Sequence, residues 1–282
     1  MIHTVNYFIT KLFDIVLYPF AYLPDFWGIL FLSILVSLVV LVVYKHVSSP
    51  TKIKETKNRI KSNILAIRLY KDFWRVIGVS FLKSLAYTGK YFFLNFGPIL
   101  LIVPILFPVL AQMDARYGLR SFEKGETFAL SARFNQDLRQ IKVELLENDA
   151  FKPTMNPVFI NAYEDEERTI PIHEVNWKLE AGADGQTDLQ IKVDGQVFSK
   201  SLVVGPFRGA LSNEKFRTSN LAHFLYPVEK RLDGAVYLEE ISLRYPGKNV
   251  TVLGLPIHWL LLHLVIVVFI VLGLKKRFGV EF

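Results

Sequence analysis

Three long segments without a charged side chain constrain this sequence more than any other feature. They cover residues 27–44, 91–113 and 252–274. A helix needs about 20 apolar residues to cross the hydrocarbon core of a bilayer. Helices buried in a globular protein keep a polar face, and the first and third segments have none. The sequence therefore predicts an integral membrane protein with three membrane-spanning helices.

The second segment differs from the others because it contains Pro98, Pro104 and Pro108. Each proline removes a backbone hydrogen-bond donor from a helix. Membrane helices tolerate proline where neighbouring groups satisfy the freed carbonyls. We expect this segment to span the bilayer as well, interrupted by its prolines.

The distribution of lysine and arginine predicts the orientation. Residues 45–90 contain eleven Lys and Arg against only Glu55 and Asp72, and the third segment is followed by Lys275-Lys276-Arg277. Lys11 is the one Lys or Arg before the first segment. Basic side chains near membrane helices stay on the cytoplasmic side. We predict a multi-pass protein of the inner (cytoplasmic) membrane, with its N-terminus outside and its C-terminus in the cytoplasm.

These boundaries divide the chain into seven parts, which together form a membrane α-helical bundle with an inserted extracytoplasmic β-sandwich domain. The first part, 1–24, places polar residues at helical spacing opposite apolar ones, as in a helix that lies in the membrane interface. The others are a first span (25–44), a basic cytoplasmic helical hairpin (45–90), a second span (91–113), an extracytoplasmic β-sandwich-like domain (114–250), a third span (251–274) and a cytoplasmic tail (275–282).

The basic hairpin is predicted from two amphipathic stretches, one that starts at Ser48-Ser49-Pro50 and reaches Arg68, and a second at 73–87. The isoleucines of the first stretch leave one apolar edge between basic residues, which are Lys52, Lys54, Lys57, Arg59, Lys61 and Arg68. We expect these six to face anionic lipid headgroups, which attract each basic residue by about 1 kcal/mol. A solvated basic linker is the alternative. Positive charge also binds nucleic acid, but the membrane already accounts for it, and we predict no specific nucleic-acid binding.

Between the second and third segments the hydrophobic pattern changes from helical to alternating. The residues that read as strands are 127–134, 140–146, 158–162, 175–180, 189–193, 197–203 and 236–245. Asp194-Gly195 is a hairpin turn signal, and Trp177 is a candidate core anchor. Seven short strands separated by turn residues predict a small β-sandwich. Residues 206–232 interrupt it with a loop and a short helix near 220–225.

Catalytic groupings are hard to find in this sequence. The chain has no cysteine, which excludes disulfides, thiolate metal sites and a cysteine nucleophile. Residues 164–167 are all acidic but read as a solvated turn, and His173 and His223 stand apart from any partner spacing. No phosphate-binding loop, nucleophile elbow or zinc motif occurs. We predict a protein that is not an enzyme, with no cofactor and no metal.

Four polar residues lie inside the predicted spans. They are Ser33 and Ser37 on one face of the first span, Asn95 in the second and His263 near the middle of the third. Unpaired polar groups in lipid are costly, so Asn95 and His263 must face protein or water. The four could line a polar groove open to the cytoplasm. Alternatively, the serines bond their own backbone and the other two hold helices together.

The order of elements carries a family resemblance. The sequence Ile9-Thr10-Lys11-Leu12-Phe13, then Phe26-Trp27-Gly28 through Tyr44 and the basic hairpin, and the stretch from Pro98 to Pro104 resemble the YidC/Oxa/Alb membrane protein insertases, in particular their three-span, archaeal YidC-like branch. The resemblance covers residues 5–113, and 252–282 by topology. Bacterial members differ in two ways. They carry an arginine in the first core span, and their β-domain precedes that span.

Two functions remain open. The resemblance implies an insertase or chaperone that assists insertion or folding of membrane proteins through a cytosol-open polar groove, with nascent membrane proteins as partners. The alternative is a non-enzymatic scaffold of a cell-envelope complex, whose β-domain binds another subunit.

Overall fold

A computed structural model describes residues 2–163, 171–217, 226–234 and 237–281 of the chain. The chain forms two compact units. The unit that we call the β unit combines residues 1–28 with 108–259, and the helical unit combines 29–107 with 260–282. The predicted acidic turn at 164–167, the predicted helix near 220–225 and His223 lie outside the described residues.

Four helices build the helical unit. They are α2 (Asp25–Val47), which begins in the β unit, α3 (Pro50–Leu69), α4 (Trp74–Met113), which ends in the β unit, and α6 (Trp259–Phe278). Among the described residues, three helices are long and apolar enough to cross a bilayer, namely α2, α4 and α6. The prediction of three such segments is therefore confirmed.

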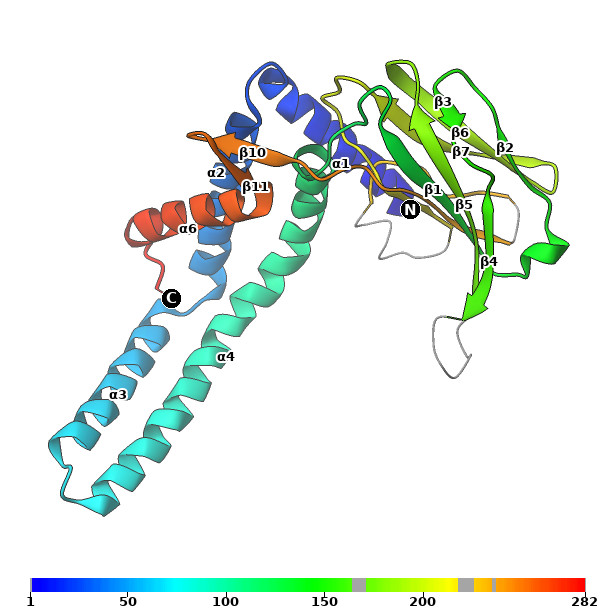
Figure 1. Cartoon of the computed structure of the whole chain (residues 1–282). Coiled ribbons are helices and arrows are strands. Elements are labelled where there is room, and N and C mark those ends of the chain that lie inside the picture. Colours follow the sequence, from blue (N-terminus) through cyan, green and yellow to red (C-terminus); the bar gives the residue numbers. More distant parts are fainter. Residues whose placement is uncertain (1, 164–170, 218–225, 235–236, 282) are drawn as a thin grey trace. The chain divides into compact units, whose positions relative to one another are not determined.

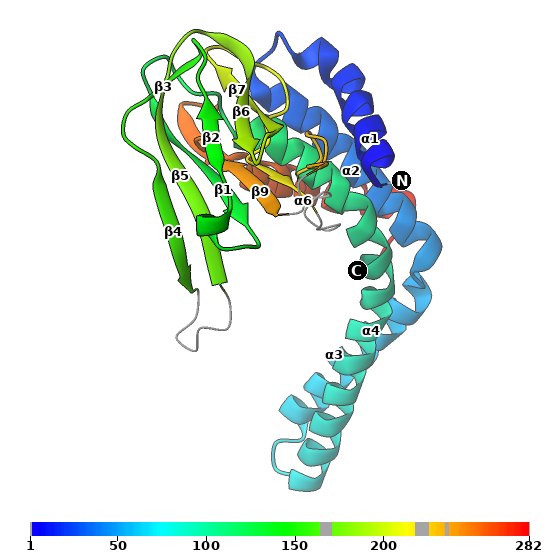
Figure 2. The same cartoon turned by 90° about the vertical axis from the view of Figure 1, so that its right-hand side faces the viewer.

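The structure has no break between the basic hairpin and the second apolar segment. The expected second hairpin helix and the expected second span form one helix, α4, of 40 residues. Pro98, Pro104 and Pro108 lie inside it, so the expected interruption at the prolines is wrong. Within the helical unit, α3 and α4 run antiparallel and side by side (Figure 1, Figure 2). The two helices thus form a helical hairpin, and its second helix continues without interruption into the apolar segment.

The β unit begins with helices and continues as sheets. Its helical elements are α1 (Ile2–Leu17), the 3-10 turn η1 (Tyr18–Phe20), a π-helical turn at Asp114–Gly118 and, between strands, the 3-10 turn η3 (Leu138–Gln140). One sheet has the strand order β3-β5-β1-β9-β8, with β4 also paired to β5. These strands are β1 (Thr127–Phe134), β3 (Phe151–Pro153), β4 (Val158–Tyr163), β5 (Pro171–Ala181), β8 (Glu214–Phe216) and β9 (Leu238–Leu243).

A second sheet has the order β2-β6-β7. Its strands are β2 (Val143–Leu146), β6 (Gly185–Val193) and β7 (Gln196–Val204). Asp194 and Gly195 join β6 to β7, and both have positive φ, 46° and 88°. Two positive φ values are what a type I′ hairpin turn requires, so the predicted turn is confirmed. A strand occurs in each of the seven predicted places, but the short β3 and β8 were not predicted.

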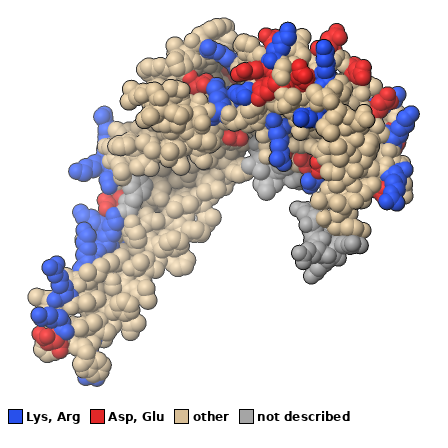
Figure 3. Space-filling model, in the orientation of Figure 1, with Lys and Arg blue, Asp and Glu red and all other residues tan. Residues whose placement is uncertain are grey.

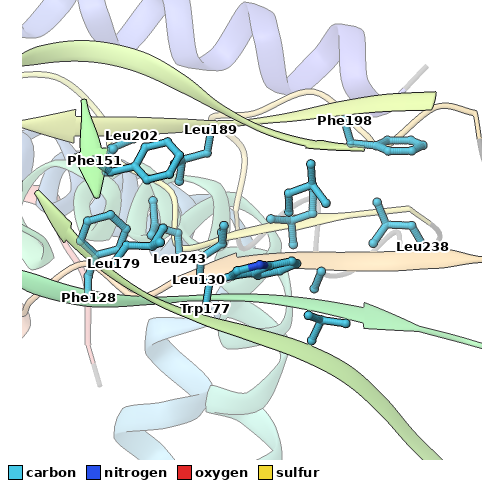
Figure 4. Packing of buried hydrophobic residues seen from close by; sticks show 14 of the residues in the cluster. Phe128, Leu130, Phe151, Trp177, Leu179, Leu189, Phe198, Leu202, Leu238 and Leu243 are labelled. Atoms are coloured by element: carbon cyan, nitrogen blue, oxygen red, sulfur yellow. The ribbon is translucent and has the colours of Figure 1, made fainter. Parts of the chain in front are cut away.

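Both sheets contribute side chains to one hydrophobic cluster. Leu130 and Leu179 come from the first sheet and Leu189 and Leu202 from the second, and all four are fully buried. Their side chains point into the space between the sheets (Figure 4). Trp177 belongs to the same cluster and is buried, as predicted. Burial of this alternating face gives the β unit its core, at about 25 cal/mol for each Å² of apolar surface removed from water.

The third apolar helix begins later than predicted. Residues Asn249–Val252 (β10) and Leu255–His258 (β11) form a hairpin. Its turn residues Leu253 and Gly254 have φ of 51° and 82°, outside the helical range. Because α6 starts only at Trp259, the expected span at 251–274 is corrected to a helix of 20 residues that ends at Phe278.

Candidate functional site

The helical unit brings three of the four predicted groove residues together. Ser37 Oγ donates to the Ser33 carbonyl at 2.6 Å, and Ser33 Oγ donates to the Ile29 carbonyl at 2.7 Å. Ser33 Oγ also lies 2.8 Å from His263 Nδ1. Ser33 and Ser37 are 0% exposed and His263 is 2% exposed. The structure thus joins α2 to α6 through a buried polar contact.

The hydroxyl geometry indicates which group donates in that contact. A serine hydroxyl has one proton and two acceptor lone pairs. Because the Ser33 proton points to the Ile29 carbonyl, the consistent arrangement has His263 Nδ1–H donating to Ser33 Oγ. A neutral imidazole in this tautomer satisfies both side chains without a charge, which suits an apolar environment.

The pair lies closer to one end of its helices than the sequence suggested. His263 is the fifth residue of α6, about 6 Å along the axis from Trp259 at 1.5 Å per residue. The expectation that it lies near the middle of the third span is wrong, because α6 begins at Trp259. Ser33 lies about 12 Å from Asp25 in α2 by the same rise. Both positions are nearer the N-terminal ends of their helices.

Asn95 does not share this hydrogen-bond chain among the described residues. Its amide nitrogen donates to the Tyr91 carbonyl of its own helix at 2.8 Å, and its side chain is half-buried. This local bond is the kind that was expected for the serines, whereas the alternative for Asn95 was that it holds helices together. Its place in a groove with Ser33, Ser37 and His263 stays a prediction.

The six basic residues of the predicted surface lie on α3. Lys52, Lys54, Arg59, Lys61 and Arg68 are exposed, and Lys57 is half-buried. Lysine and arginine side chains follow one another along α3 (Figure 3). The apolar edge includes Ile53, which is fully buried, whereas Ile64 is exposed. α3 therefore presents a basic face, and its contact with a membrane surface stays a prediction.

Two of the six basic residues also make contacts inside the helical unit. Lys57 Nζ lies 3.0 Å from Glu281 Oε1 and 5.7 Å from the Tyr91 ring centroid. Arg59 donates to Tyr87 Oη at 3.1 Å, and its guanidinium lies over the same ring. The hydrogen bond from Lys57 lowers the pKa of the Glu281 carboxyl. Lys57 and Arg59 thus help to hold α3 against α4.

The β unit contains a polar network that the sequence did not predict. Arg116 lies 2.5 Å from Asp14 Oδ1 in α1 and donates to the Gln112 and Thr10 carbonyls. Gln112 donates to Thr10 Oγ1 at 2.8 Å. These contacts tie α1 to the end of α4. The available signals were an arginine just after an uncharged segment and polar residues four apart in α1, but neither identifies the partner.

A cavity of about 770 Å³ lies beside this network, inside the β unit. Its wall includes Glu229, which pairs with Lys200 behind it. Lys200 is fully buried, and its Nζ also donates to the Ser212 carbonyl at 2.5 Å. Burial lowers the pKa of Lys200, and the Glu229 carboxylate opposes that shift. An ion pair in this position requires both partners, because either charge alone would be buried without compensation.

Comparisons with known proteins add no further site. No family model, curated protein or solved structure matches the chain. Among the described residues there is also no group of three or more histidine, aspartate or glutamate side chains that could hold a metal ion.

Proposed function

We propose that this chain is a three-span membrane protein that assists insertion of other membrane proteins. In this proposal residues 45–90 and the C-terminus are cytoplasmic, and the N-terminus and residues 114–250 are outside. The two sheets with their shared core form a β-sandwich. The three apolar helices and the placement of lysine and arginine support this arrangement. The resemblance to the YidC/Oxa/Alb insertases supplies the activity.

One structural feature supports the proposal most directly. It is the hairpin formed by α3 and the first half of α4, which we call the arm. At 1.5 Å per residue, the 40 residues of α4 extend about 60 Å. About 30 Å suffices to cross the hydrocarbon core. The remaining half would project from the membrane beside α3. One rigid helix would then link a cytoplasmic surface to the bilayer interior.

The surface of this arm suits a nascent membrane protein. α3 offers exposed basic side chains, and the first half of α4 offers exposed apolar ones, among them Phe81, Leu82 and Leu85. A nascent membrane protein combines apolar segments with polar flanks, so it needs both kinds of contact. Neither an enzyme nor a simple anchor requires an extended arm of this composition.

After a nascent protein has bound the arm, the polar residues inside the spans would act while its flank crosses the bilayer. A charged flank at the bilayer centre costs about 3 kcal/mol on insertion scales. Ser33 and His263 are buried and bonded to each other in the structure, so in this proposal they reach a passing flank only when α2 and α6 move apart. In this mechanism no covalent step occurs, and the protein only provides a less apolar path.

Photocrosslinking tests the proposal. A photoreactive residue at Leu85 on the arm should capture several different nascent membrane proteins during synthesis. The matched control is Leu272 on α6, which is also exposed and apolar but lies away from the arm, and it should capture mainly lipid. Capture of a single fixed partner at Leu85, or of lipid alone, would exclude the insertase.

A scaffold function is the second candidate, and strand β4 favours it. β4 lies off the main strand order, and β5 is its one partner among the described strands. Val158, Phe159 and Tyr163 on it are exposed. An exposed edge strand can pair with a strand of a partner. Depletion of the protein separates the two candidates, since loss of many membrane proteins indicates an insertase and loss of one complex indicates a scaffold.

A further inference from the structure

The cavity in the β unit has the size of a ligand site. It lies between α1, η1 and the segments 206–211 and 227–230. Its volume of about 770 Å³ is within the usual range for small-molecule sites. The proposed function does not use this cavity.

The wall of the cavity is strongly basic. Three acidic side chains line it, Asp14, Asp25 and Glu229, against six basic ones. The basic side chains are Lys11, Arg116, Arg120, Arg208, Lys230 and Lys248. The excess of positive charge favours an anionic ligand.

Ion pairs already occupy all three acidic residues. Arg116 forms an ion pair with Asp14 at 2.5 Å, and Lys248 forms one with Asp25 at 2.6 Å. Glu229 is held by Lys200 from behind the wall. No acidic side chain of the wall is therefore left to neutralise the remaining cations.

Arg208 and Lys230 are the cations that stay available. Both are exposed, and no carboxylate among the described residues pairs with either. Arg208 donates to the Ala21 carbonyl, which uses one of the five N–H groups of a guanidinium. Lys11 adds a third cation, 3.8 Å from Asp14. Arg120, by contrast, makes two hydrogen bonds to Glu126 at 2.8 and 2.9 Å, which lower the pKa of that carboxyl.

The rim of the cavity is apolar and aromatic. Tyr7, Tyr18 and Leu23 line it and are exposed. Phe8 and Ile15, also on α1, are exposed as well. Tyrosine side chains concentrate at the level of lipid headgroups, and an amphipathic helix in the interface buries its apolar face among acyl chains. A free phosphate would need the cations but not this rim.

We propose that the cavity binds the headgroup of an anionic phospholipid from the non-cytoplasmic leaflet. Arg208 and Lys230 contact the phosphate, since arginine can bind phosphate oxygens with two parallel hydrogen bonds. The acyl chains lie along the exposed apolar residues of α1 and η1. The proposal rests on the membrane placement of α1 within the proposed function, but not on insertase activity.

Native mass spectrometry of the full chain in detergent tests the proposal. The probes are phosphatidylglycerol, which is anionic, and phosphatidylcholine, which has no net charge. The test variant is Arg208→Gln with Lys230→Gln. The control variant is Arg139→Gln with Lys192→Gln, which removes the same charge from two exposed residues that do not line the cavity.

The chain should bind phosphatidylglycerol more tightly than phosphatidylcholine. The test variant should bind it roughly 30-fold more weakly, and the control variant should bind it unchanged. Glycerol phosphate, which lacks acyl chains, should not compete at the same concentration. Equal binding of both lipids, equal loss in both variants, no loss in either, or full competition by glycerol phosphate would each overturn the proposal. Because the assay contains no nascent protein, failure of the crosslinking at Leu85 would leave this result unaffected.

Discussion

The two units use the same residue type in opposite ways. Phe134 on β1 is 2% exposed and belongs to the core of the β unit, whereas Phe93 on α4 is 76% exposed. A phenylalanine side chain that stays exposed to water contributes no free energy of burial to folding. Large exposed apolar patches mark contact with a partner or a membrane. The two sheets of the β unit therefore bury a shared apolar core as a water-soluble domain does. The helical unit leaves apolar side chains outside, as its proposed place in lipid requires.

Their buried polar contacts differ in the same way. The β unit buries the charged pair of Lys200 and Glu229, whereas the helical unit buries the contact between Ser33 and His263, which needs no charge. Ionised groups are the most costly to place in lipid. Each unit thus buries the kind of polar contact that suits the solvent proposed for it, and three predictions can break or sharpen this comparison.

The largest difference in stability is expected between two variants, each of which truncates one phenylalanine in one of the units. Phe134→Ala should lower the unfolding free energy of the β unit by about 3–5 kcal/mol, because it leaves a cavity in the core. Phe93→Ala should change stability by under about 1 kcal/mol. Hydrogen exchange of the full chain in detergent measures both, since β1 and β5 should exchange faster only in the first variant. Similar losses in both variants would contradict the comparison.

An intermediate effect is expected from the buried ion pair. Glu229→Gln should destabilise the β unit by about 3 kcal/mol, because Lys200 would keep an uncompensated buried charge. Adding Lys200→Met should restore most of that loss. Arg133→Gln serves as the control, since its contact with Glu174 at 3.8 Å is partly exposed and is worth under about 1 kcal/mol. Thermal unfolding followed by circular dichroism is the measurement, and a double variant as unstable as Glu229→Gln would argue against the assignment.

The smallest effect is expected from the contact between α2 and α6. A double-mutant cycle with Ser33→Ala and His263→Ala should give a coupling of about 0.6 kcal/mol, as for other hydrogen bonds between membrane helices. A cycle with Ser37→Ala and His263→Ala should give almost none, because Ser37 donates to its own helix. Unfolding by dodecyl sulfate in bicelles measures both cycles. Equal coupling in the two cycles would show that Ser33 has no direct contact with His263.

The sequence predicted element types well and their ends less well. Alternation identified a strand in each of seven places, because side chains of a strand point to opposite faces in turn. It missed β3 and β8, which have three residues each and are too short for a periodic pattern. It also extended the third span back to 251, because uncharged hairpin residues look like helix by composition. Only the backbone at Leu253 and Gly254 separates the two.

The candidate sites were predicted only in part, because the sequence shows local patterns but not contacts between distant residues. The basic residues of α3 were found because charge along one helix is a local pattern. The chain of Ser33, Ser37 and His263 was predicted as a set, but not its bonds or its depth. The cavity and the pairing of Arg116 with Asp14 were missed, since no spacing links residues 102 positions apart.

By itself, the sequence determined where apolar length, basic charge and strand alternation lie along this chain, because each depends on neighbouring residues. The tertiary structure alone decided that α4 continues through three prolines, that Ser33 meets His263 and that Arg208 and Lys230 border one cavity. Such contacts depend on how distant segments pack, and packing is a property of the folded chain.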